Sequence, residues 1–254
     1  MTPTDRGAPR PAVHAPHPIL DRYYANDDDK RRFIRTIFDS TAQDYDRVDR
    51  LLAFGSGSWY RRRALQRAGL APGAKVLDVA VGTGLLAREM VTILGADGDI
   101  IGIDPSPGMM AGGAMPPAIK LVQGRAEALP FASRSFDFLT LGFALRHLED
   151  LRSVFTEFRR VLRPGGRLLL LEITRPEGRI ANTLLRAYMR GVVPLMSRTV
   201  ARHHDTPRLY RYYWDTIEAC APPTDVLSTI SDAGFSGADR YVELGIFSEF
   251  RAFA

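Results

Sequence analysis

The sequence predicts an α/β fold: a doubly wound, mostly parallel β-sheet that ends in an antiparallel hairpin. Two observations support it. Between residues 75 and 172, short apolar runs typical of strands alternate with helical patterns through short connections. Near the end of the chain, two β-rich runs, Ala238–Leu244 and Ile246–Phe253, are separated by a single glycine. A chain of 254 residues, 45% of them hydrophobic, can bury the core of one such domain.

The elements are expected in a definite order. Residues 1–20 contain five prolines and are expected to form a disordered arm. Apolar residues then recur at helical spacing from Asp29 to Tyr45 and from Trp59 to Gly69. The sheet region follows as strand Lys75–Val79, helix Gly84–Leu94, strand Asp99–Ile103, helix Pro107–Gly112, strands Ile119–Gln123 and Phe136–Gly142, helix Leu151–Leu162 and strand Arg167–Glu172. Helices are expected over Arg179–Val192, Arg208–Ala219 and Thr224–Ala233.

The composition favours a cytoplasmic protein. Cys220 is the single cysteine and cannot form an internal disulfide. The sequence shows neither a secretory signal nor 18 uninterrupted apolar residues, so no integral membrane segment is expected. Peripheral membrane contact and a homodimer both stay open. His203 and His204 are neighbours that would need distant partners to bind zinc, so no metal is expected.

The positive charge is concentrated in one segment. The formal net charge is +5, and residues 186–211 hold six arginines against one aspartate, so the rest of the chain is neutral overall. A solvated basic helix and an anion-binding surface both fit this pattern. No RNA-binding module accompanies the arginines, so a nucleic-acid partner is not expected.

The stretch VLDVAVGTGLL, residues 76–86, predicts a nucleotide-binding turn between a strand and a helix. Gly82, Gly84 and the later Asp104 fit the dinucleotide fingerprint, which keeps an NAD-dependent oxidoreductase as an alternative. Asp78, however, would repel a diphosphate at this place and attract an ammonium group. S-adenosylmethionine (SAM) has an amino acid ammonium, and ribose hydroxyls that Asp104 can bind.

Further motifs occur in the order of a known family. VLDVAVGTG, GIDPSPGMM, LVQGRAEALPFASRSFDFLTLGFALRH and EFRRVLRPGGRLLLLE resemble motifs of class I methyltransferases, and specifically of the ubiquinone/menaquinone biosynthesis C-methyltransferase family. The likeness runs from FDSTAQDYDRVDRLLAFG to ISDAGF. It implies a SAM-dependent methyltransferase with a Rossmann-like, seven-stranded, mostly parallel sheet, a C-terminal antiparallel hairpin strand and an N-terminal helical lid.

The resemblance also implies a division of the chain and a set of roles. Residues 21–254 would be one domain: a lid (21–70), a SAM-binding core (71–174), helices over the acceptor pocket (175–222) and a C-terminal helix with strands (223–254). The residues expected to bind the cofactor are Tyr45, Asp78, Gly82, Gly84, Asp104, Met109, Ala126 and Glu127. The expected acceptor is a small molecule, most simply an aromatic, quinone-like or prenylated compound methylated on carbon.

Three residues depart from the family: Arg125 puts one adenine contact in doubt, and His147 and Phe250 weaken the case for a quinone precursor. Arg125 stands where the family has an aspartate that bonds the adenine amino group, and an arginine can only donate. His147 replaces an asparagine in the sequence Leu145 to His147, and Phe250 falls where quinone enzymes carry histidine. O- or N-methylation of a secondary metabolite and a non-catalytic SAM-binding protein therefore stay open.

Methyl transfer to a carbon beside a phenol needs a group that accepts the phenolic proton or stabilises the phenolate. Arg146 and His147 are the catalytic candidates, the first as a holder of the oxyanion and the second as a base. An anionic acceptor would suit the basic segment, where the candidate substrate-binding residues are Arg198, Arg202, Arg208 and Arg211.

Overall fold

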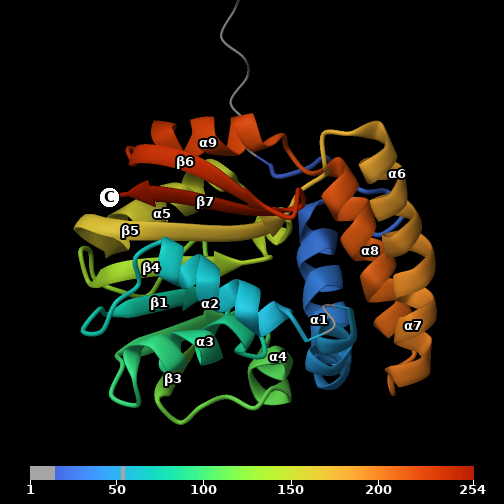
Figure 1. The fold of residues 1–254 in the computed structure, drawn as a ribbon, viewed down its shortest axis with the longest axis horizontal. Coiled ribbons are helices and arrows are strands. Elements are labelled where there is room, and N and C mark those ends of the chain that lie inside the picture. Colours follow the sequence, from blue (N-terminus) through green and yellow to red (C-terminus); the bar gives the residue numbers. More distant parts are fainter. Residues whose placement is uncertain (1–14, 53–54) are drawn as a thin grey trace, which may run out of the picture.

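One seven-stranded sheet organises the protein (Figure 1). The computed structural model describes residues 15–52 and 55–254, so most of the expected N-terminal arm lies outside the described residues. The strand order is β3-β2-β1-β4-β5-β7-β6. Strands β1 to β5 run parallel, whereas β7 is antiparallel to both β5 and β6, as predicted. The strands are β1 (Val76–Val79), β2 (Ile100–Asp104), β3 (Ile119–Gln123), β4 (Phe136–Gly142), β5 (Leu162–Ile173), β6 (Ser236–Glu243) and β7 (Phe247–Phe253).

Helices cover both faces of the sheet. Helices α2 (Gly57–Arg67) and α3 (Leu85–Leu94) pack on one face, and α5 (Leu151–Val161) and α9 (Pro223–Asp232) pack on the other. Successive side chains of a strand point to opposite faces. In β1, Val76 accordingly joins the core under α2 and α3, while Leu77 joins the core under α5. These two cores explain why the strands are almost continuously apolar.

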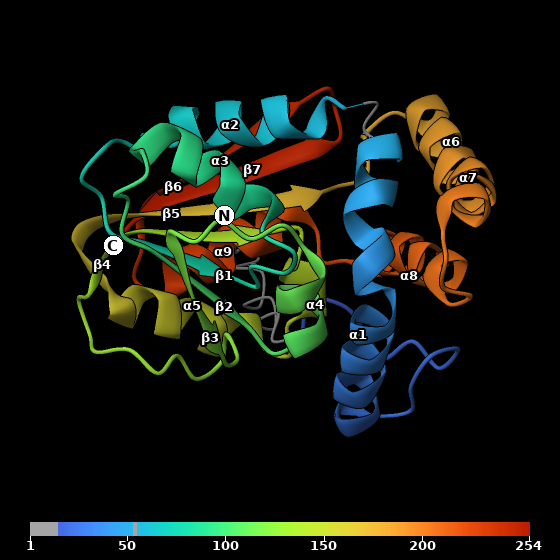
Figure 2. The same ribbon diagram turned by 90° about the horizontal axis from the view of Figure 1, so that it is seen from below.

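A third group of helices stands beyond one end of the sheet (Figure 2). It consists of α1 (Asp27–Leu52), α6 (Arg179–Ala187), the π-helical turn η2 (Tyr188–Val192), α7 (Val193–Val200) and α8 (Thr206–Ala219). Asp39 of α1 accepts hydrogen bonds from Ser106 and Gly108, at the start of the short helix α4 (Pro107–Gly112). Asp46 of α1 accepts one from Thr83. Helix α1 therefore covers the loops at the carboxyl ends of β1 and β2.

Several elements are longer than the sequence predicted, among them α1, which extends to Leu52 where Tyr45 was the expected end. The helix expected to stop at Val192 continues through η2 and α7 to Val200. Pro194 does not end it, because it occupies the first turn of α7, where a missing backbone N–H costs little. Strand β5 begins at Leu162 rather than Arg167, and its pairing with β4 shifts register between those two residues.

The segment before α1 also differs from the expectation. Residues 15–20 were expected to belong to the disordered arm, but the structure packs them on the domain. The carbonyl of Pro16 accepts a hydrogen bond from the amide of Ala221 at 2.7 Å. His17 is buried, with its ring centroid 6.4 Å from that of Tyr24. The packed chain thus begins before residue 20.

Candidate functional site

A cavity of about 500 Å³ lies at the carboxyl ends of the parallel strands, between the sheet and α1. This is where open α/β sheets bind their ligands. Eight residues predicted to act in the site border it: Tyr45, Asp78, Gly82, Asp104, Met109, Ala126, Glu127 and His147. Gly84, Arg146 and the four candidate substrate arginines are not among its lining residues.

The glycine turn between β1 and α3 has a backbone that few other residues could adopt. Gly82 and Gly84 have φ angles of +55° and +83°. A Cβ atom on Gly84 would lie 2.6 Å from the sulfur of Met115. Gly82 borders the cavity, whereas Gly84 does not. Gly84 is the N-cap of α3 and contributes the backbone conformation that the turn needs.

Asp78 is a buried carboxyl group with one unused oxygen. Its Oδ1 accepts a hydrogen bond from the Thr140 hydroxyl at 2.6 Å, and its Oδ2 has no partner among the described residues. Burial raises the pKa of Asp78 to about 7. A buried carboxyl group with a free oxygen at the cavity wall fits a cationic ligand, because a nearby positive charge restores the ionised form.

Asp104 is the last residue of β2 and links the glycine turn to the loop that precedes α4. Its Oδ2 accepts a hydrogen bond from the amide of Gly82 at 2.9 Å, and its Oδ1 accepts one from the amide of Ser106 at 2.8 Å. Burial raises its pKa to about 6. Because each carboxylate oxygen has two lone pairs, both oxygens can still accept hydrogen bonds from a pair of hydroxyl groups.

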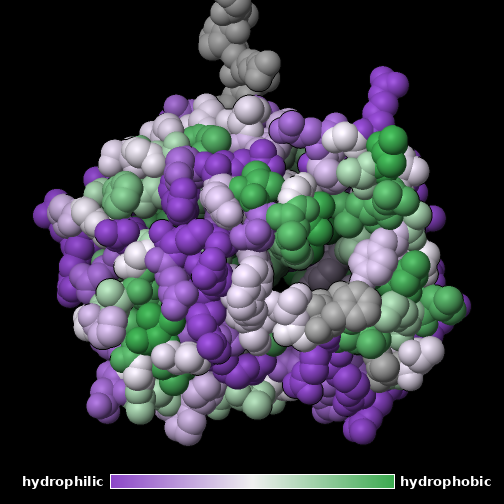
Figure 3. Space-filling model, viewed as in Figure 1, coloured by the Kyte–Doolittle hydropathy of each residue, from purple (hydrophilic) through white to green (hydrophobic). Residues whose placement is uncertain are grey.

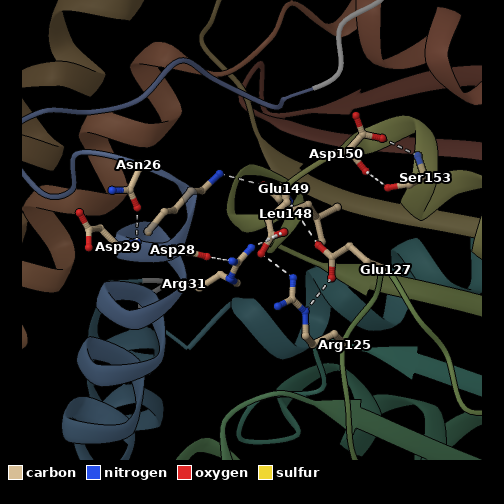
Figure 4. Close-up of polar contacts among 11 residues, drawn as sticks. Asn26, Asp28, Asp29, Arg31, Arg125, Glu127, Leu148, Glu149, Asp150 and Ser153 are labelled. Atoms are coloured by element: carbon tan, nitrogen blue, oxygen red, sulfur yellow. Dashed lines mark hydrogen bonds and ion pairs between the residues drawn. The ribbon is translucent and has the colours of Figure 1, made fainter.

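An ion-pair network holds the rim of the cavity (Figure 4). Arg125 donates to Glu127 at 3.4 Å and also pairs with Glu149. Glu149 in turn accepts from Arg31 of α1 at 3.0 Å, and its amide donates to Glu127 at 3.3 Å. Arg125 therefore fixes the carboxylate of Glu127 at the cavity, close to Ala126, and ties this loop to α1.

Another part of the cavity lining is aromatic and surrounds His147. The His147 ring stacks on Tyr212 with centroids 5.5 Å apart, and Phe38 meets its edge at 5.2 Å. Its Nδ1 lies 3.3 Å from the Tyr212 hydroxyl, whereas its Nε2 has no hydrogen-bond partner among the described residues. Burial, followed by the charges of Arg146 and Lys30, holds the pKa of His147 well below its usual range. The imidazole is therefore neutral at neutral pH.

Comparison with known proteins agrees with this geometry. The ubiE/COQ5 methyltransferase family model matches residues 25–249. The chain belongs to this family. The UbiE ubiquinone/menaquinone biosynthesis C-methyltransferase of Hahella chejuensis is 33% identical over 213 residues, which cover 81% of this chain and 84% of that protein. The corresponding enzyme of Pseudoalteromonas translucida is 33% identical over 216 residues, covering 82% and 85%.

Solved structures show the same fold in other SAM-dependent methyltransferases. One from Aquifex aeolicus matches with a TM-score of 0.58 at 18% identity, covering 82% of this chain and 97% of that chain. One from Thermotoga maritima matches with a TM-score of 0.60 at 18% identity, covering 86% and 98%. Family and fold together make the protein a SAM-dependent methyltransferase, so the NAD-dependent oxidoreductase alternative is wrong.

The structure of this ubiE/COQ5 family member does not bring Arg146 to the cavity. Arg146 is 1% exposed and forms an ion pair with Glu172 of β5. Its guanidinium lies 4.7 Å from the centre of the Tyr213 ring, which does border the cavity. A buried arginine needs a carboxylate partner, and Glu172 takes that place. Arg146 thus supports a cavity wall, in contrast to the expected contact with an acceptor.

The four candidate substrate arginines also lie away from the cavity. Arg198, Arg202, Arg208 and Arg211 are all exposed. The cause in α8 is its amphipathic pattern, which turns Tyr210, Tyr213 and Trp214 inward and leaves arginines on the opposite face. Arg208 lies over the ring of Phe33, 5.2 Å from its centroid. The geometry does not support direct contact of these arginines with a ligand in the cavity.

Lys30 is a cavity residue that the sequence analysis missed. It is 3% exposed and borders the cavity, and its Nζ donates to the carbonyl of Leu148 at 2.8 Å. It has no ion-pair partner within the part of the chain that the structure describes. The available signal was its position, since it lies on the same face of α1 as the apolar Ile34 and Ile37.

One cluster of metal-ligating residue types exists among the described residues. His203, His204 and Asp205 bring one ligand atom each within 4.8 Å of one another. The three residues are consecutive, so the cluster contains none of the distant partners that a zinc site at His203 and His204 was expected to need. His204 is exposed and the cluster lies outside the cavity lining, so it takes no part in the site.

Proposed function

We propose that this methyltransferase transfers a methyl group from SAM to a ring carbon of a hydroquinone-like aromatic acceptor. The observation that carries the proposal is the division of the cavity. The lining of the cavity includes two carboxylates at the strand ends, Asp78 and Asp104, a group of aromatic side chains around His147, and the buried Lys30. The relatives described above are named as C-methyltransferases of ubiquinone and menaquinone biosynthesis, which agrees with such an acceptor.

The strand-end residues bind the cofactor in this proposal. Asp78 pairs with the amino acid ammonium through its free oxygen, and Asp104 accepts hydrogen bonds from the ribose hydroxyls. Met109, Ala126 and Glu127 border the adenine. Arg125 orients Glu127, so an acceptor for the adenine amino group is present even though the family's aspartate is replaced.

SAM supplies an activated methyl group, and the protein's contribution is position and the exclusion of water. Tyr45 of α1 accepts a hydrogen bond from Tyr213 of α8 at 2.9 Å, and both residues border the cavity. This contact holds the helical cover closed over the strand ends. Phe38 adds apolar surface on the same side.

His147 and Lys30 activate the acceptor. In the tautomer with its proton on Nδ1, His147 donates to the Tyr212 hydroxyl and leaves Nε2 free to take a phenolic proton. Desolvation by burial lowers the pKa of Lys30, and in its protonated form the ammonium group stabilises the phenolate that forms. Loss of the phenolic proton moves electron density onto the neighbouring ring carbon. A new C–C bond to the methyl group would form there as the S–CH3 bond breaks and S-adenosylhomocysteine leaves, and the hydrogen on that ring carbon would then be lost as a proton, which restores the aromatic ring.

The test is methyl transfer from isotopically labelled SAM to a naphthohydroquinone with a free ring carbon. Mass spectrometry and NMR of the product locate the label. The proposal expects a carbon-bound methyl group and no transfer to a matched naphthalene that lacks hydroxyl groups. A label on oxygen, or on the nitrogen of an amine offered in parallel, would overturn it in favour of O- or N-methylation.

A further inference from the structure

We propose that the outer face of α6, η2 and α7 docks the protein on the surface of an anionic lipid bilayer. Four large apolar side chains on this face are exposed: Ile180 by 80%, Leu184 by 66%, Val192 by 43% and Leu195 by 63%. The space-filling view shows apolar residues gathered over these helices (Figure 3). The inference concerns a surface outside the cavity and does not depend on which acceptor is methylated.

The exposed residues form a stripe along one side of a continuous helical segment. Ile180 and Leu184 are one turn apart in α6, and Leu195 continues the stripe beyond the π-helical turn. The other side of the same segment is buried, with Met189 and Val193 packed in the core of the helical group. One apolar side of the segment is therefore buried, whereas the side that carries the stripe is exposed.

Unpaired arginines accompany the stripe. Arg179, Arg198 and Arg202 are exposed and have no ion-pair partner among residues 15–52 and 55–254. Arg186 and Arg190 differ, because both pair with Glu218 of α8. Arg179 begins α6, Arg198 lies near the end of α7, and Arg202 lies in the bend that follows it. Guanidinium groups on the same segment as an apolar stripe match the headgroups and acyl boundary of an anionic bilayer.

The dimensions favour a helix that lies on the membrane. The stripe from residue 180 to residue 195 is about 22 Å long at 1.5 Å per residue, which is shorter than a bilayer core. None of the helices in the described part of the chain is long and apolar enough to cross a membrane. Interfacial binding through one apolar side fits these limits.

Charge favours a bilayer over a second copy of the chain as the occupant. A twofold interface would place the same patch opposite itself and would bring the unpaired Arg179 and Arg198 of two copies together. Such like-charge contacts oppose association, whereas phosphate headgroups neutralise the same arginines.

The experiment is co-sedimentation with vesicles of phosphatidylcholine, prepared with and without phosphatidylglycerol. We expect the protein to bind the anionic vesicles and to lose this binding as salt is raised. The Leu184→Glu/Leu195→Glu variant should bind at least about tenfold more weakly, as should Arg198→Glu/Arg202→Glu. Leu121→Glu, on the exposed edge strand β3, is the matched control and should bind like the original protein.

SAM titration of each variant verifies that it is folded, because none of the substituted residues borders the cavity. Equal vesicle binding by the Leu184→Glu/Leu195→Glu variant would overturn the proposal. So would failure of the original protein to bind anionic vesicles. A dimer that this double variant converts to a monomer, with no vesicle binding by either, would identify the face as a contact between two copies of the chain.

Discussion

The two halves of the cavity are built in different ways. The strand-end half consists of Asp78, Gly82 and Asp104, which lie within 27 consecutive residues and are held by backbone hydrogen bonds and by the strands themselves. The helical half consists of side chains from distant segments, such as Lys30, His147 and Tyr213. One half depends on local chain geometry and the other on the packing of separate helices.

This difference separates binding from chemistry. The strand-end half offers carboxylates to a cationic nucleoside, and two of its acidic groups have raised pKa values because they are buried. The helical half offers a neutral imidazole and a buried ammonium among aromatic rings. Substitutions in the first half should change cofactor affinity, and substitutions in the second should change turnover.

The largest effect is expected for Lys30→Met. Loss of the buried positive charge removes stabilisation from the phenolate, so kcat with a hydroquinone acceptor should fall about 100- to 1,000-fold. Arg32→Met is the control, because Arg32 also borders the cavity but is exposed and paired with Asp29. If Lys30→Met keeps more than a third of the original kcat, the helical half does not hold the charge that develops in the reaction.

Asp104→Ala should have the next largest effect. The change removes charge-assisted hydrogen bonds to the ribose, each worth about 1.5–3 kcal/mol, so SAM affinity should fall about ten- to hundredfold. Asp99 directly precedes the first residue of the same strand, at the end far from Asp104, and Asp99→Ala should leave SAM affinity unchanged. Isothermal titration measures both variants, and equal SAM affinity in both would contradict the cofactor assignment.

A smaller effect, about tenfold, is expected from pH. Burial raises the pKa of Asp78 to about 7, so the carboxyl group is mostly protonated at about pH 6. A bound ammonium favours the ionised form, so SAM affinity should rise about tenfold from about pH 6 to about pH 8 and then level off. Titration in buffers of different ionisation enthalpy should show proton release at the lower pH. A similar rise and release in Asp78→Asn would assign the effect to another group.

The smallest effect is expected at the rim. Arg125 is 42% exposed, and an exposed ion pair contributes about 1 kcal/mol at most, so Arg125→Ala should weaken SAM binding about fivefold or less. Arg163→Ala removes a comparably exposed arginine that pairs with Asp137, away from the cavity, and serves as the control. Complete loss of SAM binding in Arg125→Ala would show that the network of Figure 4 is required for the strand-end half to form.

Much of the fold could be predicted from local sequence. The bounds of α4, β3 and β4 agree with the prediction because turn residues delimit these elements, such as Pro107 at the first turn of α4. The continuous helix from α6 to α7 was missed, since the predicted helix ends at Val192, two residues before Pro194. A π-helical turn and the first-turn position of the proline let the helix continue there, and sequence spacing does not reveal this.

The candidate site shows the same difference between residues placed by local sequence and residues placed by long-range packing. Asp78, Gly82 and Asp104 were found because their spacing follows from one strand-turn-helix unit. Arg146 was placed at an acceptor because its buried partner, Glu172, lies on another strand and cannot be inferred from the pattern around Arg146. Lys30 was missed because its contact with the cavity depends on how α1 packs over the strand ends.

The most direct test of this division is the SAM dissociation constant of Lys30→Met measured beside that of Asp104→Ala, by isothermal titration at about pH 8, where Asp78 is ionised. The account predicts that Lys30→Met binds SAM within about twofold of the original protein, while Asp104→Ala binds at least about tenfold more weakly. A loss of SAM affinity in Lys30→Met as large as that in Asp104→Ala would contradict the separation of cofactor binding from acceptor chemistry.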